Sequence, residues 1–241
     1  MLLSDLSSIF TWWIVLLLIG GAFLPLTTLL FSQFLDRGYV FSKILGMLLL
    51  SYTLFLFGSL KFLPFTQTAI IVVLGGFIGL NVWILRKNKL KLRDIFRSSW
   101  KIFALEELLF LGTLTFWSYI RAHEPSIHGL EKYMDQGFVN SILRSDYFPP
   151  KDMWYTSLPI NYYYFGHLVT AVLTKLSGIT PFITYNLMMA TLFALLFTGA
   201  FSIGINLISM VKRGVAGEGA PHRVPAGRKS TEDIGWGWSP T

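Results

Sequence analysis

Cysteine is absent from this sequence of 241 residues, and charged residues are scarce. Without cysteine, disulfide bonds and thiolate metal sites are excluded. Only 14% of the residues are charged, 53% are hydrophobic, and the mean hydropathy is +0.56. A soluble domain of this length needs far more charged surface, so the composition predicts an integral membrane protein. The alternating stretches of about ten residues that an outer-membrane barrel requires are also missing.

What the sequence does contain is a series of long apolar runs. The hydrocarbon core of a bilayer, about 30 Å thick, takes about 20 helical residues to cross. The sequence therefore predicts an all-α integral membrane protein with about six transmembrane helices, at 9–31, 39–60, 65–85, 100–121, 162–177 and 181–211. Residues 1–8 lack the basic region of a signal peptide, and the run after them is long enough to span, so we expect no cleavable signal.

One connector is strongly basic and sets the orientation that we expect. Residues 86–101 hold one acid, Asp94, and seven bases: Arg86, Lys87, Lys89, Lys91, Arg93, Arg97 and Lys101. Between two spans such a cluster indicates the cytoplasmic side and contact with anionic headgroups of the bilayer, and we expect no nucleic-acid partner. Loop 86–99 is then cytoplasmic, loop 122–160 lies outside, and the membrane is the plasma membrane. With six spans, Lys212 and Arg213 also fall outside, against the usual bias.

The chain divides into three regions on this reading. Residues 1–99 contain three spans and the basic segment 86–99, which is expected to lie in the inner interface. Residues 100–211 contain three further spans and the large outer loop. Residues 212–241 are rich in Gly, Pro and Arg from Gly214 onward, and the sequence predicts a disordered or non-native tail there.

The long polar loop, 122–160, holds the candidate chemistry. Residues 129–145 fit a short amphipathic helix, on which Glu131 and Asp135 are spaced i, i+4 and share a face. Two such carboxylates suit a general base or the binding of a divalent cation beside a phosphate. The alternative is a solvated helix face with Lys132 beside the acids.

Histidines and tyrosines of the same region leave their roles open. His123, Glu124 and His128 lack the spacing and the further ligands of a zinc site. His167, one turn into the fifth predicted span, is either a functional group or an interfacial hydrogen-bonding residue. The tyrosines at 162–164 are equally consistent with an aromatic belt and with a binding site.

Few charges fall inside the predicted spans. Glu106 and Glu107 lie within one to two turns of the cytoplasmic edge, where a structural role at headgroup level is expected. The other charges, such as Lys61 and Lys175, lie near the ends of spans. A transporter usually needs ionisable groups deeper in the bilayer, so this pattern disfavours transport.

A set of motifs between 120 and 200 resembles a known family, the "YYY" membrane proteins. The matching segments are Glu131–Asp135, Asn140–Ser145, Tyr147–Pro150, Asp152, Trp154, Asn161–Gly166 and Tyr185–Leu187. This family is similar to the C-type glycosyltransferase superfamily, multi-spanning enzymes that use polyprenyl-phosphate sugars. The chain departs from the pattern at Met153, where the family has proline, and such enzymes have more spans, so the chain resembles an N-terminal portion.

The resemblance implies a set of site residues and a donor. Glu131 or Asp135 is then the catalytic acid, as base or metal ligand. The implied substrate-binding residues are Lys132, Arg144, Asp152, Trp154, Asn161, Tyr162, Tyr163, Tyr164 and His167. Lys132 and Arg144 suit the donor phosphate, and a divalent cation remains an open cofactor. The competing hypothesis is a non-enzymatic membrane protein, transporter-like or scaffolding, whose outer loop binds a partner.

Overall fold

The computed structural model describes residues 3–129 and 131–218, which form seven α-helices. The helices are α1 (Leu3–Leu30), α2 (Tyr39–Ser59), α3 (Gln67–Lys87), α4 (Leu92–His123), α5 (Lys132–Arg144), α6 (Phe165–Ser177) and α7 (Pro181–Glu218). Within these residues the only β pairing is an isolated bridge between Lys151 and Pro159. The chain divides into two compact units, 1–206 and 207–241, and the features discussed below belong to the first.

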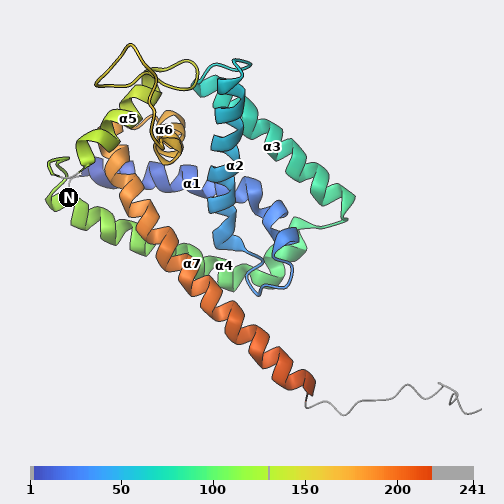
Figure 1. Ribbon diagram of the computed structural model, residues 1–241. Coiled ribbons are helices and arrows are strands. Elements are labelled where there is room, and N and C mark those ends of the chain that lie inside the picture. Colours follow the sequence, from blue (N-terminus) through green and yellow to red (C-terminus); the bar gives the residue numbers. More distant parts are fainter. Residues whose placement is uncertain (1–2, 130, 219–241) are drawn as a thin grey trace, which may run out of the picture. The chain divides into compact units, whose positions relative to one another are not determined.

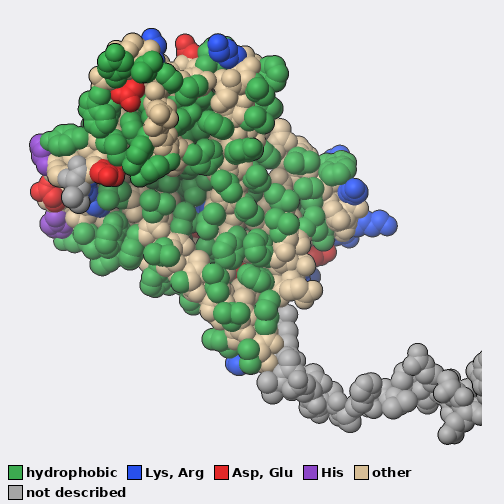
Figure 2. Space-filling model, viewed as in Figure 1, with side chains coloured by type: hydrophobic (Ala, Val, Ile, Leu, Met, Phe, Trp, Pro, Cys, Tyr) green, Lys and Arg blue, Asp and Glu red, His purple; other side chains and the backbone are tan. Residues whose placement is uncertain are grey.

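Five of the helices in the described ranges are long and apolar enough to cross a membrane. They cover Ser4–Leu30, Tyr39–Ser59, Gln67–Lys87, Arg93–His123 and Pro181–Lys212. The prediction of an all-α membrane protein is therefore confirmed. Large apolar side chains such as Leu108 (68% exposed) and Leu196 (73% exposed) face outward, and Figure 2 shows apolar groups covering most of the visible face. In water such a surface would be unstable, whereas lipid tails solvate it.

The predicted fifth span, 162–177, is wrong as a membrane crossing. Its helix, α6, begins only at Phe165 and has 13 residues, so it rises about 20 Å, well short of the hydrocarbon core. Leu168, Ala171 and Leu173 of α6 are buried, and α6 contacts α1, α2, α3 and α5. Its apolar residues are covered by protein rather than by lipid, which hydropathy alone does not distinguish.

Helix α4 joins two segments that the sequence analysis separates. It runs without a break from Leu92 to His123 and so includes the second half of the basic segment 86–99 as its first turns. Ile95 and Phe103 bury against Leu24 of α1. The amphipathic start of α4 is thus anchored by its apolar face on α1.

The core is built around α1, which contacts α2, α3, α4 and α6. Trp12, Leu16, Ile19 and Phe23 form its buried stripe, at helical spacing. The indole Nε1 of Trp12 donates to Thr191 Oγ1 of α7 over 2.8 Å. Buried aromatic N–H groups need such a partner, and this bond ties α7 to the core.

Helix α7 links the two ends of the bundle. Near its start, Tyr185 contacts Asp135 of α5, and further along Ser202 and Asn206 contact Asp36 in the turn between α1 and α2. About 30 Å of helix rise separates Tyr185 from Asn206, which equals the thickness of a hydrocarbon core. In Figure 1 the start of α1, the end of α4, α5 and the start of α7 gather at one end of this unit.

Candidate functional site

Asp135 lies at the meeting point of three helices. Its Oδ1 is 3.1 Å from Nε2 of His167, near the start of α6, and its Oδ2 accepts a hydrogen bond of 3.3 Å from the hydroxyl of Tyr185 on α7. The side chain of Asp135 is 31% exposed and that of His167 is 17% exposed. Both carboxylate oxygens are therefore oriented by a partner, while the group still reaches solvent.

The packing of α5 on α6 creates this arrangement. Phe138, Val139 and Ile142 of α5 are buried, and they press the helix against α6. Asp135 lies one turn before them and is carried to the first turn of α6. The ring of Phe138 meets the imidazole of His167 edge to face, with centroids 5.4 Å apart. The predicted amphipathic helix at 129–145 is present as α5, and its apolar face holds the acid in place.

Glu131 has different surroundings from Asp135. It is exposed at the amino-terminal cap of α5, where its backbone carbonyl accepts from the Asp135 amide over 2.9 Å. Within the described residues no hydrogen bond or ion pair holds its carboxylate. The structure thus brings Asp135, and not Glu131, together with His167.

An aromatic cavity of about 280 Å³ adjoins this cluster. Trp154, Asn161 and Tyr162 line it together with Phe138. The Phe138 ring lies 5.9 Å from that of Tyr162 and 6.5 Å from that of Trp154. Because Phe138 also touches His167, the cavity and the Asp135 cluster share one wall. Four of the predicted substrate-binding residues, Asp152, Trp154, Asn161 and Tyr162, therefore line one cavity.

Asp152 stabilises the loop that forms this cavity. Its Oδ1 accepts from the backbone amides of Trp154 at 2.7 Å and Tyr155 at 2.9 Å. Such a bond pattern fixes a turn after an aspartate. The amide of Asp152 also donates to the Leu158 carbonyl over 2.9 Å. Asp152 is thus already used in shaping the loop, whatever else it contacts.

A more polar cavity of about 590 Å³ lies beside the same loop. Arg144, Lys151, Asp146 and Asp152 line it. Arg144 is exposed, and its Nε donates to the Asn140 carbonyl over 3.1 Å, which leaves the end of the guanidinium for other acceptors. Lys132, the other cation expected at a phosphate, lies at the start of α5 and lines neither of these two cavities.

The tyrosine triplet splits into different environments. Tyr162 faces the aromatic cavity, Tyr163 is 72% exposed, and Tyr164 packs against Phe55 with ring centroids 6.2 Å apart. The Tyr162 hydroxyl donates to that of Tyr163 over 2.6 Å, and this bond raises the pKa of Tyr162 to about 12. Burial raises the pKa of Tyr164. The triplet is therefore neither a uniform belt nor a single binding surface.

No set of metal ligands accompanies these residues. Across 3–129 and 131–218, no three His, Asp or Glu side chains gather closely enough to hold an ion. The pair of Asp135 and His167 supplies two ligands, and a magnesium ion held by one or two carboxylates would take its other ligands from water and substrate phosphate.

The sequence analysis missed a buried polar network on the far side of the core. Nζ of Lys43 on α2 lies 2.5 Å from Oε2 of Glu107 on α4, and Glu107 also accepts from Tyr39 at 2.8 Å and from Trp13 at 2.6 Å. Lys43 is 2% exposed. The prediction of Glu107 at headgroup level thus overlooked its partner, although Lys43 stands inside the predicted span 39–60.

Asp36 and Glu106 extend this network, and both are 0% exposed. Asp36 accepts from Ser202 at 2.5 Å, from Asn206 at 2.9 Å and from the Gly38 amide at 3.1 Å. Both carboxyl oxygens of Glu106 are buried without a hydrogen-bond partner among the described residues. The signal in the sequence was weak, because Asp36 stands in a short turn between spans and only the fold turns it inward.

These features define a multi-pass helical membrane protein with a site built by its longest loop and the ends of α5, α6 and α7. Comparison with family models then places the chain: residues 49–227 match the family described as "Uncharacterized membrane protein (DUF2298)", and the chain belongs to it. The match includes Asp135, His167, Tyr185 and the residues that line the two cavities, but not Asp36 or Lys43 of the buried network. It extends past Gly214 into the segment expected to be a tail, of which 219–241 lie outside the described residues. No curated protein and no solved structure matches the chain.

Proposed function

We propose that this protein is a membrane glycosyltransferase, or the amino-terminal portion of one, that transfers a sugar from a polyprenyl-phosphate donor to a hydroxyl acceptor. The observation that carries the proposal is the Asp135 carboxylate, oriented by His167 and Tyr185 beside an aromatic cavity. A base needs such orientation together with access to substrate. The resemblance to the C-type superfamily supplies the donor class, by analogy.

In the proposed reaction Asp135 is the general base. Its carboxylate takes the proton of the acceptor hydroxyl while that oxygen forms a bond to the anomeric carbon of the sugar. The bond from this carbon to the phosphate oxygen breaks, and the polyprenyl phosphate leaves with the electron pair. His167 and Tyr185 are positioning residues, because they hold the two carboxylate oxygens. The geometry favours Asp135 over Glu131, which no such partner orients.

The two cavities suit the two parts of the donor, its sugar ring and its phosphate. The aromatic cavity with Trp154 and Tyr162 suits the apolar face of a sugar ring, and Asn161 offers it a donor and an acceptor. The polar cavity with Arg144 and Lys151 suits the donor phosphate, since a guanidinium pairs well with phosphate oxygens. Both cavities include Asp152, so they adjoin at the loop that it shapes, as a sugar and the phosphate bonded to it require.

We further propose that the 122–160 loop lies outside and that 86–99 lies in the cytoplasm of a plasma-membrane protein. Five spans, rather than six, support this orientation. With an odd number of crossings, Lys212 and Arg213 fall on the same side as the basic segment 86–101. With six spans these two basic residues would lie outside, against the positive-inside rule; with five spans they follow the rule.

The test compares Asp135→Asn with Glu131→Gln in membranes that contain the full protein. Removing a general base slows proton transfer, so we expect Asp135→Asn to reduce transfer from a labelled polyprenyl-phosphate hexose about 10²- to 10⁴-fold. Glu131→Gln, a matched loss of one carboxylate on the same helix, is expected to stay within about tenfold of the wild type. Transfer at the wild-type rate by Asp135→Asn contradicts the assignment.

Transport is a second candidate, and the buried network is the observation that favours it. The positions of the charged residues along the sequence disfavour transport, because they show no ionisable residues deep in the spans. The structure places Asp36, Lys43, Glu106 and Glu107 in the interior, largely shielded from solvent. Such groups inside a membrane protein often mark an ion or proton path. Replacing Glu106 distinguishes the two hypotheses. If the protein is a transporter, Glu106→Gln should abolish ion-coupled uptake. If it is a glycosyltransferase, Glu106→Gln should leave sugar transfer intact, provided that the fold is retained.

A further inference from the structure

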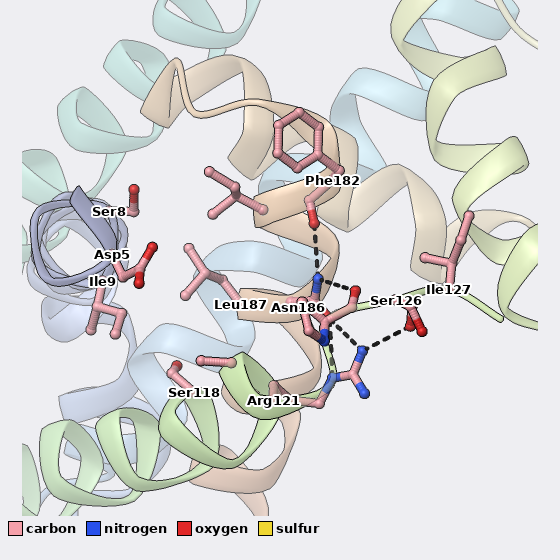
Figure 3. Close-up of a pocket in the computed structure, with 13 residues that line it drawn as sticks. Asp5, Ser8, Ile9, Ser118, Arg121, Ser126, Ile127, Phe182, Asn186 and Leu187 are labelled. Atoms are coloured by element: carbon pink, nitrogen blue, oxygen red, sulfur yellow. Dashed lines mark hydrogen bonds between the residues drawn. The ribbon is translucent and has the colours of Figure 1, made fainter. Parts of the chain in front are cut away.

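A separate cavity of about 470 Å³ lies where α1, α4 and α7 meet, at the end of the bundle that carries the long loop (Figure 3). Its walls are mostly apolar, with Ile9 from α1 and Phe182 and Leu187 from α7. Ser118 and Arg121 from α4 and Asn186 from α7 add polar groups, and Asp5 of α1 is the one acidic residue in the lining. Neither Asp135, nor His167, nor any residue that lines the aromatic cavity lines this one.

Arg121 is held in position by neutral groups. Its Nε and Nη2 donate to Asn186 Oδ1 over 3.0 and 2.5 Å, and Nη2 also approaches the Ser126 carbonyl at 3.5 Å. The amide of Asn186 is fixed in turn, because it donates to the carbonyls of Pro125 at 3.2 Å and Phe182 at 2.9 Å. These bonds orient the guanidinium through neutral acceptors, while the carboxylates of Glu124, at the end of α4, and Asp5, in the lining of the cavity, are the acidic groups nearby. Further N–H donors of the guanidinium remain for a ligand.

Ser118 supplies a second, independent sign of a ligand. It is 7% exposed, and its Oγ has no hydrogen-bond partner among the described residues. A buried hydroxyl without a partner is unfavourable by about 1–3 kcal/mol. Ser118 lies one helical turn before Arg121 on α4, so both side chains line the same wall of the cavity. An anion that accepts from Arg121 and Ser118 together would satisfy both.

We propose that this cavity binds the anionic headgroup of a membrane lipid, with its phosphate on Arg121 and Ser118 and its acyl chain along Ile9, Phe182 and Leu187. The planar guanidinium matches phosphate oxygens, and the apolar walls match a chain rather than water. The volume is in the range of pockets for amphiphiles of moderate size. The proposal does not rest on sugar transfer, because it involves none of the residues assigned to that reaction.

Binding of phosphatidylglycerol to the detergent-purified full chain, followed by native mass spectrometry, tests this site. We expect Arg121→Gln to weaken binding about tenfold, the loss of one charge-assisted hydrogen bond. Lys61→Gln, which removes an exposed cation in the turn between α2 and α3 that lines none of these cavities, is expected to leave binding within about twofold. Equal weakening by both variants, or none by Arg121→Gln, overturns the proposal.

Two further arms separate the sources of the phosphate and guard against misfolding. Ser118→Ala removes only a hydroxyl without a partner, so the fold should be retained while lipid binding falls a few-fold; unchanged binding overturns the role of Ser118. Phosphatidylcholine and inorganic phosphate serve as competitors at equal concentration. We expect neither to displace phosphatidylglycerol, and displacement by inorganic phosphate would mean that the apolar walls bind no chain.

Discussion

A phenol that donates a hydrogen bond gives up its proton less readily than a free one, and Tyr162 is in this position. Its hydroxyl donates to Tyr163, and the nearby carboxylates of Glu131 and Asp135 add to the effect. Tyr162 therefore stays protonated at neutral pH. Its proton is donated to Tyr163, so in the proposed site its oxygen is the group that can accept from a sugar hydroxyl in the aromatic cavity.

Replacing Tyr163 by Phe tests this account. The acceptor is lost, so we expect the pKa of Tyr162 to fall from about 12 toward the ordinary value of 10.0. The fall should be partial because the two carboxylates remain. Titration of ¹³C-labelled tyrosine by NMR measures the value. Tyr52→Phe, an exposed tyrosine on α2, is the control and should leave it unchanged. An unaltered Tyr162 pKa in Tyr163→Phe speaks against the hydrogen bond.

At the scale of the element, α1 shows how a proline is tolerated within a span. Pro25 lacks an N–H and its ring disturbs the hydrogen-bond ladder of the helix. The amide of Leu26 donates instead to Asn81 Oδ1 of α3 over 3.0 Å, and Asn81 is 2% exposed. A neighbouring side chain thus satisfies a backbone group that lipid cannot. This bond also fixes α3 against α1.

Asn81→Leu is expected to destabilise the protein by about 1–3 kcal/mol, because the Leu26 amide is left buried without an acceptor. Unfolding in mixed micelles of increasing SDS fraction measures the change. Asn88→Ala, at the exposed carboxyl end of α3, is the control and should cost about 0.5 kcal/mol or less. In a Pro25→Ala background the loss from Asn81→Leu should shrink, since α1 can then complete its own ladder. Equal losses in both backgrounds would exclude this coupling.

For the whole molecule, the number of crossings decides which groups share a side of the membrane. On the proposed topology, five spans put Lys212 and Arg213 of α7 on the side of the 86–99 segment, whereas six would put them on the side of the 122–160 loop. The absence of cysteine makes this easy to test, since any introduced thiol is unique.

Single cysteines at Ser98, Ser126 and Gly214 should label as two groups with an impermeant maleimide on intact cells. We expect Ser126→Cys to react from outside, and Ser98→Cys and Gly214→Cys to react only after the membrane is opened. Labelling of Gly214→Cys together with Ser126→Cys would restore the sixth span. Labelling of Ser98→Cys from outside would reverse the orientation.

The sequence by itself determined the class of the protein and the extent of most helices, because hydropathy and length respond directly to the bilayer. It also determined α5, whose apolar residues recur at helical spacing. Asp135 was thereby predicted as one of two candidate catalytic acids on that helix. The motifs around 131–166 pointed to the same loop. These are local properties, which a linear pattern records.

Only the tertiary structure decided which residues meet. Asp135 is distinguished from Glu131 by partners on α6 and α7, which lie far along the chain. The apolar run of α6 is the same whether lipid or protein covers it, so its burial among α1, α2 and α3 was not evident from composition. Lys43 and Glu107 are likewise 64 residues apart and become an ion pair only when α2 packs on α4. Contacts between distant segments depend on how the helices pack, and the sequence of a single segment does not determine that packing.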